Sequence, residues 1–408
     1  MRRAKVLYIS MHGLGAPLTR LHGLLQLKAL PERGRSVSVL SFETRRKSPL
    51  ERAQYELERR ALSDAGIGHT AVPRLGSRWL EVPLGALVVL WLVVFRGVRT
   101  LHARSYVPAI MAVLVRSVTP ARVVFDMRGL FVDEYILEGA LRDGSAKLDF
   151  ARRLERWLLA RSDVLVVVSE RFREHLLTCG LYGGCVDPSR ISLIPNRVDL
   201  ARFDSALERR EEARARRGYE GQTVGVFAGS ASPWHRLDLT AALMKRVMDA
   251  RGDVRFVVAV YPSTSDAERV LREQGLPRPR TELLTVPTDA VPSLFAACDF
   301  GLMLIDEDIS KTVCAPVKLG EYLASGLPVV AGGGIGDARD WVGEEGLGLL
   351  VDLDDIAGAS RRVLEFLHSD AFVSGAARRR ARAFAEERMD MSETVEQYER
   401  IYQSLDPR

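Results

Sequence analysis

The stretch from Lys311 to Ala331, KTVCAPVKLGEYLASGLPVVA, carries the two side chains whose types and spacing are best suited to chemistry. Lys318 and Glu321 are three residues apart and therefore share one face of a predicted helix. A cation and a carboxylate near a helix N-terminus can bind a phosphate and a sugar hydroxyl together, because the helix dipole favours the anion. The alternative is a surface ion pair, which stabilises a helix by only about 0.2–0.5 kcal/mol. Spacing alone favours the ion pair.

The residues around this pair predict a loop, a short helix and a buried strand. Pro316 suits the first helical position, because proline lacks the amide hydrogen that a helix start leaves unpaired. Gly326 and Pro328 end the helix, and an apolar strand through Ala331 follows. The predicted helix would therefore hold both charged side chains beside the end of a strand.

A second polar group follows a glycine turn earlier in the same half of the chain. The strand that begins at Val224 runs into Gly229 and Ser230, and His235 and Arg236 come just before a helix. Backbone amides in such a turn can cradle a phosphate, and the two basic side chains could clamp it. The alternative, which carries equal weight, is an exposed loop behind a packed Trp234.

The first half of the chain offers two further groups at the ends of predicted strands. The strand VLYIS runs into a turn that contains Gly13 and Gly15, where backbone could approach a ligand. This turn is not a dinucleotide fingerprint, because Leu18 occupies the place of the third glycine. The strand from Arg122 ends at Asp126 and Arg128, which are candidate ligand contacts or, alternatively, a helix cap with its ion pair.

Composition sets the outer bounds of the function. The chain has 408 residues, 47% of them hydrophobic and 27% charged, which is typical of a globular protein with more than one core. The net charge of +5 suits an anionic ligand or membrane surface and is too small to indicate nucleic acid. The four cysteines form no C-x-x-C pair, and the first apolar run is too short for a signal peptide, so a cytoplasmic location is expected.

Short apolar strands alternate with helices along the whole chain, which predicts an α/β protein with parallel sheets. The boundary between two domains is predicted near Asp199, ahead of a charged segment from Glu208 to Arg217 that is expected to be a solvated linker helix. The first domain then covers residues 1–199 and the second residues 200–387. The last helix, from about residue 388, is expected to belong to the first domain.

The string P-x-K-x-x-E-Y-L-A-x-G-x-P-V-V around Lys318 and Glu321 resembles the donor-binding helix of retaining glycosyltransferases of the group 1, family 4 type. In that family the motif is Glu-x7-Glu, and its second Glu, here Glu321, contacts the ribose of the sugar nucleotide. The first Glu falls on Val313 and is absent, as in a branch of the family that has the P-x-K-x-x-E form. The strings H-A-R-S-Y and F-D-x-R-G resemble the same branch, and I-P-N-R-V-D resembles the family's I-P-N-G-V-D hinge, with Arg197 in place of Gly.

This resemblance implies the GT-B fold, in which two doubly wound Rossmann-like domains face each other across a cleft and a C-terminal helix crosses back to domain one. It implies transfer of a sugar from a UDP-linked donor to an acceptor hydroxyl, with retention and no obligatory metal or cofactor. The wider family often has a sugar-contacting His at Asp126, so the position carries over more firmly than the role. The implied residues are Asp126, Arg128 and Lys318 for catalysis, Arg104 on the acceptor side, and Gly13, Gly15, Gly229, Ser230, His235, Arg236, Pro287, Lys318 and Glu321 for the donor.

The most apolar stretch, Val82 to Phe95, has 14 residues, fewer than the roughly 18–20 that span a bilayer. A buried core helix is the first interpretation. The second is a patch that lies in the membrane interface, with Trp91 at the surface and Arg96 and Arg99 on phospholipid headgroups. Because related enzymes act on lipid-linked or cell-surface glycans, we expect weak attachment to the inner face of the cell membrane.

Two other functions are compatible with the same residues. A sugar-nucleotide epimerase or dehydrogenase could use a similar sheet, but the incomplete glycine fingerprint disfavours it. A catalytically inactive sugar-nucleotide binder or partner subunit would explain Val313 and the altered phosphate clamp. Donor binding without transfer would distinguish that binder from an enzyme.

Overall fold

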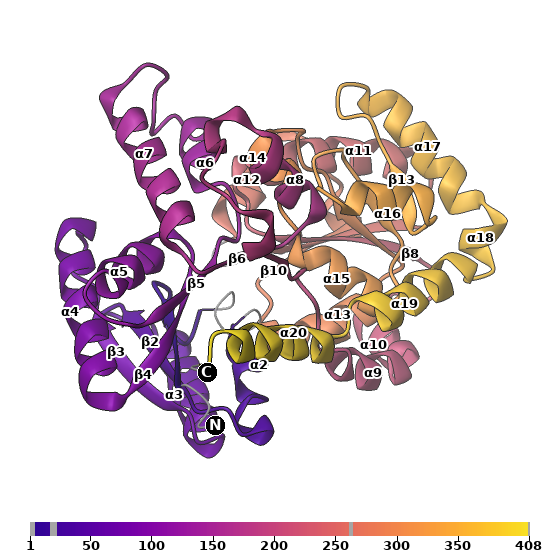
Figure 1. Ribbon diagram of the computed structural model, residues 1–408. Helices are drawn as coiled ribbons and strands as arrows, with labels where there is room; N and C mark the ends of the chain where they lie inside the picture. Colours follow the sequence, from indigo (N-terminus) through magenta and orange to yellow (C-terminus); the bar gives the residue numbers. More distant parts are fainter. Residues whose placement is uncertain (1–4, 17–22, 261–263, 407–408) are drawn as a thin grey trace. The chain divides into compact units, whose positions relative to one another are not determined.

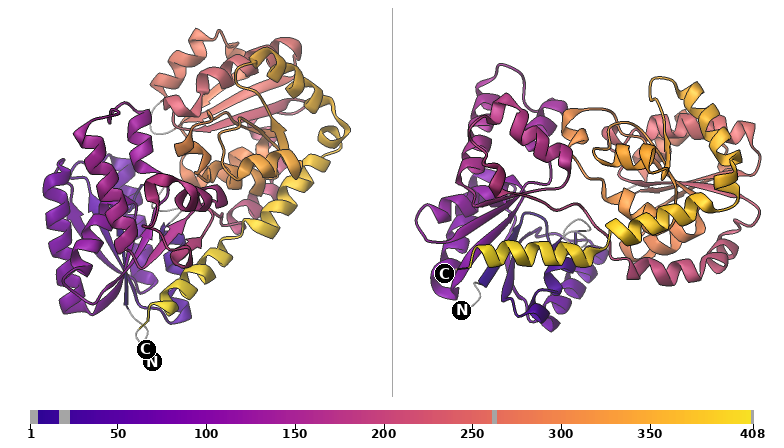
Figure 2. Two further views of the ribbon diagram at one scale, coloured as in Figure 1. Left: turned by 45° about the horizontal axis from the view of Figure 1, so that its top comes forward. Right: turned by 45° about the vertical axis from the view of Figure 1, so that its right-hand side comes forward.

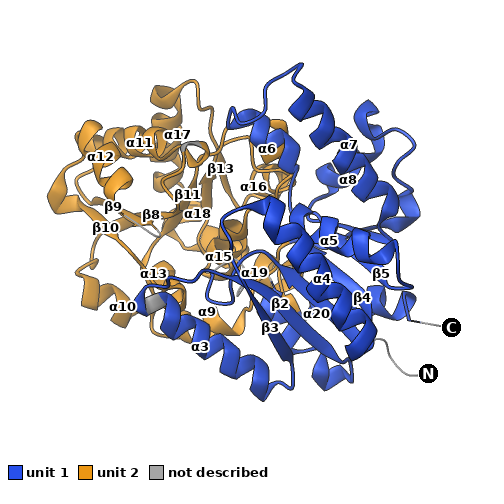
Figure 3. Ribbon diagram, turned by 90° about the vertical axis from the view of Figure 1, so that its left-hand side faces the viewer, with its two compact units in different colours: residues 1–195, 392–408 blue, residues 196–391 orange. Residues whose placement is uncertain are grey.

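The computed structural model describes residues 5–16, 23–260 and 264–406, which form two compact units. Figure 3 colours the first unit, residues 1–195 and 392–408, and the second, residues 196–391. The sequence predicted the boundaries at Asp199 and near residue 388. In the structure the segments from Asn196 to Asp199 and from residue 388 to Met391 both belong to the second unit.

Seven strands form the parallel sheet of the first unit, in the order β3-β2-β1-β4-β5-β6-β7 (Figure 1). They are β1 (Lys5–Ser10), β2 (Val37–Glu43), β3 (Gly68–Pro73), β4 (Val98–Arg104), β5 (Arg122–Asp126), β6 (Val164–Val167) and β7 (Ile191–Leu193). The order changes direction between β1 and β4, and the loops that follow such a pair form the usual binding crevice of an open parallel sheet.

The helices of this unit connect the strands, and one comes from the far end of the chain. They are α2 (Leu25–Lys28), α3 (Pro49–Asp64), α4 (Arg78–Arg96), α5 (Tyr106–Arg116), α6 (Phe131–Leu137), α7 (Ala146–Arg161), α8 (Glu170–Thr178) and α20 (Met391–Ser404). The last helix, α20, is drawn in yellow in Figure 2. Its Tyr398 and Tyr402 lie in one core cluster with Tyr8 and Val166 of the sheet. The buried guanidinium of Arg35 also pairs with Glu399, at 2.9 Å. The C-terminal helix therefore packs on the first unit, as the GT-B resemblance implied.

Six parallel strands form the sheet of the second unit, in the order β10-β9-β8-β11-β12-β13. They are β8 (Thr223–Gly229), β9 (Val254–Val260), β10 (Thr281–Leu284), β11 (Phe300–Met303), β12 (Val329–Ala331) and β13 (Gly348–Leu350). Alternate residues of these strands enter two core clusters, Val226 and Val257 on one face and Phe227 and Val258 on the other. A sheet buried on both faces explains why its strands are continuous apolar runs.

Helices cover both faces of this sheet. They are α9 (Ala201–Glu208), α10 (Arg210–Arg217), α11 (Leu237–Ala250), α12 (Ser265–Glu273), α13 (Val291–Ala297), α14 (Ile309–Thr312), α15 (Val317–Ala324), α16 (Ala338–Glu344), α17 (Ile356–His368), α18 (Asp370–Val373) and α19 (Ala376–Arg388). The chain turns between α18 and α19 at Gly375, whose φ of 72° keeps the two from forming one continuous helix.

The segment around Gly68 and His69 forms the polar edge strand β3, which pairs with β2 through its backbone. The segment from Glu208 to Arg217 was expected to be a solvated helix, but Arg214 is 8% exposed. Its guanidinium donates to the Ala297 carbonyl at 2.8 Å and pairs with Asp299 at 3.0 Å, so it anchors α10 to the end of α13.

The apolar stretch from Val82 belongs to α4, which is longer than predicted and continues through Pro83. Its inner face packs closely on α5, since a Cβ at Gly85 would lie 2.5 Å from Met111 Sδ. The opposite face is open to solvent, so the interpretation as a fully buried core helix was wrong. The large side chains on the solvent face are Trp79, Leu80, Leu87, Trp91, Val94 and Phe95.

Candidate donor and acceptor sites

The strongest candidate donor site lies in the second unit, where α15 meets the carboxyl ends of β8 and β11. These two strands are neighbours at which the strand order changes direction, the usual position of a ligand in such a sheet. Tyr322 of α15 fixes the helix there, because its hydroxyl accepts a hydrogen bond from the Ala228 amide at 3.0 Å. Gly326 follows the end of α15 and has a φ of 67°, a left-handed conformation that stops the helix, as predicted.

Lys318 and Glu321 do not form the surface ion pair that was the alternative from sequence. Glu321 is 9% exposed, and Lys318 lies over the ring of Phe227 at 5.2 Å. Among the described residues neither side chain has a hydrogen bond or a contact short enough for a salt bridge. A largely buried carboxylate without a hydrogen-bond partner is unusual, because it loses most of its hydration without compensation.

The protonation of this pair follows from its burial. Burial lowers the pKa of Lys318 to about 7, although the nearby Glu321 carboxylate opposes the change. Burial also raises the pKa of Glu321 to about 7, against the opposing charges of Arg202 and Lys318. Both groups therefore titrate near neutral pH, which is common for groups in ligand sites.

Gly229 and Ser230 form the turn next to Lys318, as the sequence predicted. Gly229 has a φ of 149°, and a Cβ at this position would collide with Lys318 Nζ. Only glycine lets the lysine reach the end of β8 in this way. The turn and the lysine together present amides and a cation at the same edge of the sheet.

His235 and Arg236 lie beside this turn, but their partners are the protein's own groups. His235 Nδ1 donates to the Ser230 carbonyl at 2.8 Å, so Nε2 carries no hydrogen in the neutral ring. Burial and the charges of Lys318 and Lys311 lower the pKa of His235 to about 3. Arg236 pairs with Asp238 at 3.1 Å and Asp306 at 2.5 Å. Their roles as a phosphate clamp stay predictions.

Two further cations, which no sequence motif predicted, lie at this site. Lys311 of α14 is 8% exposed, with Nζ 4.7 Å from the centre of the Trp234 ring. Arg202 of α9 donates to the Thr288 carbonyl at 3.0 Å, just after Pro287, and its charge acts on Glu321. Lys311 and Arg202 lie outside the motifs that the sequence offers. The tertiary fold brings both of them to the carboxyl edge of the second sheet, close to the donor site.

The predicted residues of the first unit gather at the carboxyl edge of its own sheet. Arg104 ends β4 and lies opposite Asp126 of β5 in the strand register. Asp126 has no exposed surface, and its Oδ2 accepts from Arg128 Nε at 2.9 Å. Arg128 has a φ of 61°, a left-handed conformation that is strained for a residue with a side chain.

A buried hydrogen-bonded chain leads from α20 to this carboxylate. The Tyr402 hydroxyl lies 2.6 Å from His102 Nδ1, and His102 Nε2 lies 3.4 Å from Asp126 Oδ2. Burial alone would raise the pKa of Asp126, but the Arg128 charge and the His102 hydrogen bond lower it to about 2. Asp126 is therefore an ionised carboxylate that holds Arg128 in place.

Gly13 and Gly15 pack against the first unit's own side chains and backbone. A Cβ at Gly13 would lie 2.7 Å from Glu43 Oε2, and one at Gly15 would lie 3.1 Å from the Glu51 carbonyl oxygen. Glu43 also accepts from the Leu14 amide at 2.9 Å. The close approach that requires glycine here is to the protein itself, and the predicted donor contact of this turn stays a prediction.

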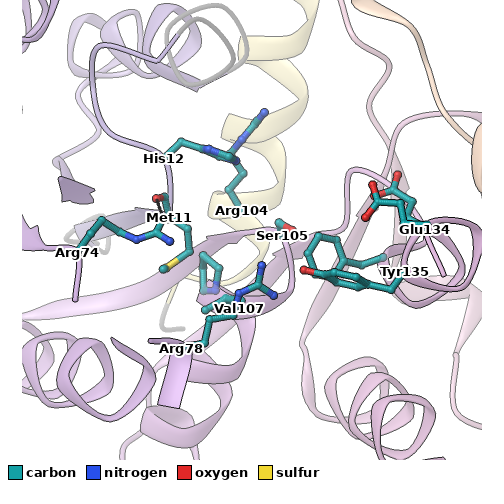
Figure 4. Close-up of a pocket in the computed structure, with 12 residues that line it drawn as sticks. Met11, His12, Arg74, Arg78, Arg104, Ser105, Val107, Glu134 and Tyr135 are labelled. Carbon is teal, nitrogen blue, oxygen red and sulfur yellow. Dashed lines mark hydrogen bonds between the residues drawn. The ribbon is translucent and has the colours of Figure 1, made fainter. Parts of the chain in front are cut away.

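A pocket of about 290 Å³ opens in the first unit, beside the loops that follow β1 and β4 (Figure 4). Arg104, the predicted acceptor-side residue, lies in its wall, together with aromatic and charged side chains from α4 and α6. The lining residues are Met11, His12, Arg74, Arg78, Arg104, Ser105, Val107, Pro108, Phe131, Glu134, Tyr135 and Glu138. The described residues hold no group of three or more side chains placed to bind a metal ion.

Comparison with known proteins identifies the family. The model named Glycosyltransferase Family 4 matches residues 24–202, and the model named Glycosyl transferases group 1 matches residues 222–369. No curated protein matches the sequence at a significant level.

Solved structures share the fold at low sequence identity. Sucrose-phosphate synthase from Thermosynechococcus elongatus has a TM-score of 0.76 at 16% identity, with 99% of each chain covered. Anabaena Alr3699/HepE in complex with UDP-glucose has a TM-score of 0.72 at 16% identity, covering 98% of this chain and 99% of that one. WaaG, a glycosyltransferase involved in lipopolysaccharide biosynthesis, has a TM-score of 0.69 at 16% identity, covering 97% and 99%.

The two family models together cover most of the chain, and the two sheets have the strand orders of a GT-B protein. The chain therefore belongs to the group 1, family 4 glycosyltransferases, enzymes that use nucleotide sugars.

Proposed function

We propose that this enzyme transfers a hexosyl or N-acetylhexosaminyl group from a UDP-sugar to an acceptor hydroxyl, with retention, in the synthesis of cell-surface glycans or glycoconjugates. The observation that carries the proposal is the buried Glu321 and the half-buried Lys318, neither of them paired among the described residues, beside Gly229 at the edge of the second sheet. The Anabaena relative, whose structure contains UDP-glucose, supports a uridine nucleotide.

The chemistry follows from what each group can do. Glu321 can accept hydrogen bonds from the ribose hydroxyls, which satisfies a carboxylate that otherwise has no partner. Lys318 can hold the diphosphate, whose negative charge grows as the bond to the sugar breaks. The acceptor hydroxyl attacks the same face of the sugar that the diphosphate leaves, and the diphosphate oxygen takes its proton.

Arg128 is the proposed cation on the side of the first unit. Asp126 has no exposed surface, so it acts on Arg128 as a positioning residue and does not contact the sugar. The sequence suggested a catalytic role for Asp126, and we propose instead that Asp126 positions Arg128. Because a fixed cation needs no reorganisation when charge develops, such positioning contributes to transition-state stabilisation.

A donor panel tests the proposed transfer. Purified protein is incubated with UDP-glucose, UDP-galactose, UDP-N-acetylglucosamine, GDP-mannose and ADP-glucose, and released nucleotide is measured with and without a panel of lipid-linked and soluble acceptors. We expect acceptor-dependent release from one of the UDP-sugars. UDP binding without release from any donor would instead support an inactive partner subunit, and NAD binding would support a sugar-nucleotide-modifying enzyme.

We also propose that the enzyme works at the inner face of the cell membrane, with α4 on the lipid surface. Within the described ranges α4 is the one helix long and apolar enough to cross a membrane, yet only 28% of its apolar window is buried. Trp79 is 83% exposed and Phe95 70%. The helix's single acidic residue, Glu81, is buried, so its exposed charges are cationic and suit anionic lipid.

Flotation with liposomes tests this location. We expect the protein to float with vesicles that contain phosphatidylglycerol at low salt, and to float less as salt rises or after Trp91→Glu. Val118→Glu, which alters an exposed apolar residue outside α4, is the matched control and should float normally. A wild-type protein that stays at the bottom of the gradient at low salt would refute the membrane proposal.

A further inference from the structure

The second unit holds a lysine at the edge of its sheet, Lys311, that belongs to none of the sequence motifs. Lys311 lies on α14, the short helix that precedes α15, and it is 8% exposed. Its ammonium group lies 4.7 Å from the centre of the Trp234 ring, which is itself 36% exposed. Attraction to an aromatic ring fixes an ammonium group without neutralising it. Lys311 is therefore a positioned cation at the border of the donor site.

Lys318 lies between two other groups of this site. The charges of Arg202 and Lys318 act on the Glu321 carboxylate, which is one helical turn further along α15. On the other side, Lys318 Nζ adjoins Gly229, and a Cβ at Gly229 would lie 3.4 Å from His235 Cε1. Burial and then the charge of Lys318 lower the pKa of His235. Lys318 is therefore close enough to both Glu321 and His235 to act on each of them.

Lys311 lies beyond His235. The rings of His235 and Trp234 have centres 3.6 Å apart, and the ammonium group of Lys311 lies over the Trp234 ring. The charge of Lys311 also lowers the pKa of His235, after burial and the larger effect of Lys318. The order of the ionisable groups along this edge is therefore Glu321, Lys318, His235 and Lys311.

This order matches the order of the groups in a nucleotide sugar. In the proposed function the ribose lies at Glu321, so the α-phosphate comes next, and the β-phosphate and the sugar follow. Lys318, one turn from Glu321, is then placed for the phosphate next to the ribose, and Lys311 for the phosphate that carries the sugar. The two ammonium charges also match the two negative charges of the diphosphate in a nucleotide sugar.

The basic side chains that the sequence predicted as the phosphate clamp are less suited to this role. Arg236 donates through Nε and Nη2 to the two oxygens of Asp238, each at 3.1 Å, and through Nη1 to Asp306 at 2.5 Å. A phosphate would have to displace a carboxylate in order to bind Arg236. The ring of His235 is neutral at pH 7, because its pKa is about 3. The two lysines are therefore the better candidates for the diphosphate.

We infer that Lys311 binds the β-phosphate of the donor, with Trp234 as its positioning residue, while Lys318 binds nearer the ribose. This inference rests on the proposed glycosyl transfer and adds to it a catalytic residue from α14, outside the donor-helix motif. The bond between the sugar carbon and the β-phosphate oxygen breaks during transfer, and its electron pair passes to that oxygen. A cation fixed beside the β-phosphate stabilises the charge that develops there.

Calorimetry with UMP and UDP tests the inference on the full chain, because the two ligands differ by the β-phosphate alone. Lys311→Met removes the charge and keeps a long side chain. We expect it to weaken UDP about tenfold and to change UMP by less than about twofold. Lys318→Met should weaken both ligands. Lys245→Met is the matched control, since Lys245 pairs with Asp249 on α11, and it should change neither affinity.

Variants of Trp234 test the positioning role. Trp234→Leu should lower the ratio of UDP affinity to UMP affinity several-fold, because the ammonium group of Lys311 loses the ring that fixes it. Trp234→Phe keeps an aromatic ring and should restore most of that ratio. Equal changes in UMP and UDP affinity would show that Trp234 has only a packing role and would refute the positioning.

Two results would overturn the assignment of Lys311 to the β-phosphate. The first is a wild-type protein that does not prefer UDP to UMP, or a Lys311→Met variant that loses affinity for both ligands equally. The second comes from a donor with an acidic sugar. If Lys311→Met weakened UDP-glucuronate but left UDP unchanged, Lys311 would bind a carboxylate of the sugar and not a phosphate.

Kinetics separates this inference from the proposed function. If a UDP-sugar is transferred and Lys311→Met keeps the wild-type kcat and UDP affinity, the inference is wrong and the transferase activity stands. If Lys311→Met weakens UDP and not UMP, but the wild-type enzyme turns over no donor, the proposed reaction is wrong and the inferred phosphate contact stands.

Discussion

Glu321→Gln should make the empty protein more stable at alkaline pH and weaken nucleotide binding. The reason is that Glu321 is 9% exposed with no hydrogen-bond partner among the described residues. Burial raises its pKa from 4.5 to about 7, so holding the ionised form in the fold costs about 3 kcal/mol above that pH.

The sign of the pH dependence follows from linkage. Between about pH 4.5 and 7 the folded protein binds a proton at Glu321 that the unfolded chain has released, so stability falls as pH rises through this window. Glutamine removes that dependence. We therefore expect the difference in free energy of unfolding, variant minus wild type, to be about 2 kcal/mol larger at pH 8 than at pH 5.

Urea unfolding at the two pH values measures this difference, and calorimetry measures UDP affinity. The variant should bind UDP about 10–100-fold more weakly, because charge-assisted hydrogen bonds contribute about 1.5–3 kcal/mol each. Glu365→Gln, at an exposed position on α17, should change neither quantity. A stability difference that is the same at both pH values, with unchanged UDP affinity, would refute the reasoning.

Three further variants probe the two sheets. Lys318→Ala should lower kcat about 100-fold with a much smaller effect on KM in steady-state kinetics, because the diphosphate gains charge in the transition state; equal activity would move that role to Lys311 or Arg236. Gly229→Ala should destabilise the fold by about 1–3 kcal/mol and reduce activity, since its φ is 149° and a Cβ would displace Lys318; normal stability in urea would contradict this. Asp126→Asn should cost about 3–5 kcal/mol, because it breaks the ion pair between a fully buried carboxylate and Arg128. Wild type should also lose about 2 kcal/mol as pH falls from about 4 to 2, because the pKa of Asp126 is about 2 in the fold, and the variant should lack that loss.

The sequence by itself determined the fold class and the family, because both depend on local patterns. Apolar runs predicted strands such as β5, which runs from Arg122 to Asp126 as expected. The string around Lys318 identified the donor helix, and Gly326 marked the end of that helix through its left-handed backbone.

Tertiary structure decided which charges are buried and what they contact. Lys318 and Glu321 have the spacing of a surface ion pair, and only the packing of α15 against the sheet buries Glu321 and places Lys318 over the Phe227 ring. Asp126 looked available at the end of β5, but Tyr402, nearly three hundred residues later, encloses it through His102. The packing of α5 at Gly85 covers one face of α4, while the opposite apolar face stays exposed. Burial is a property of contacts between distant segments, so local spacing cannot encode it.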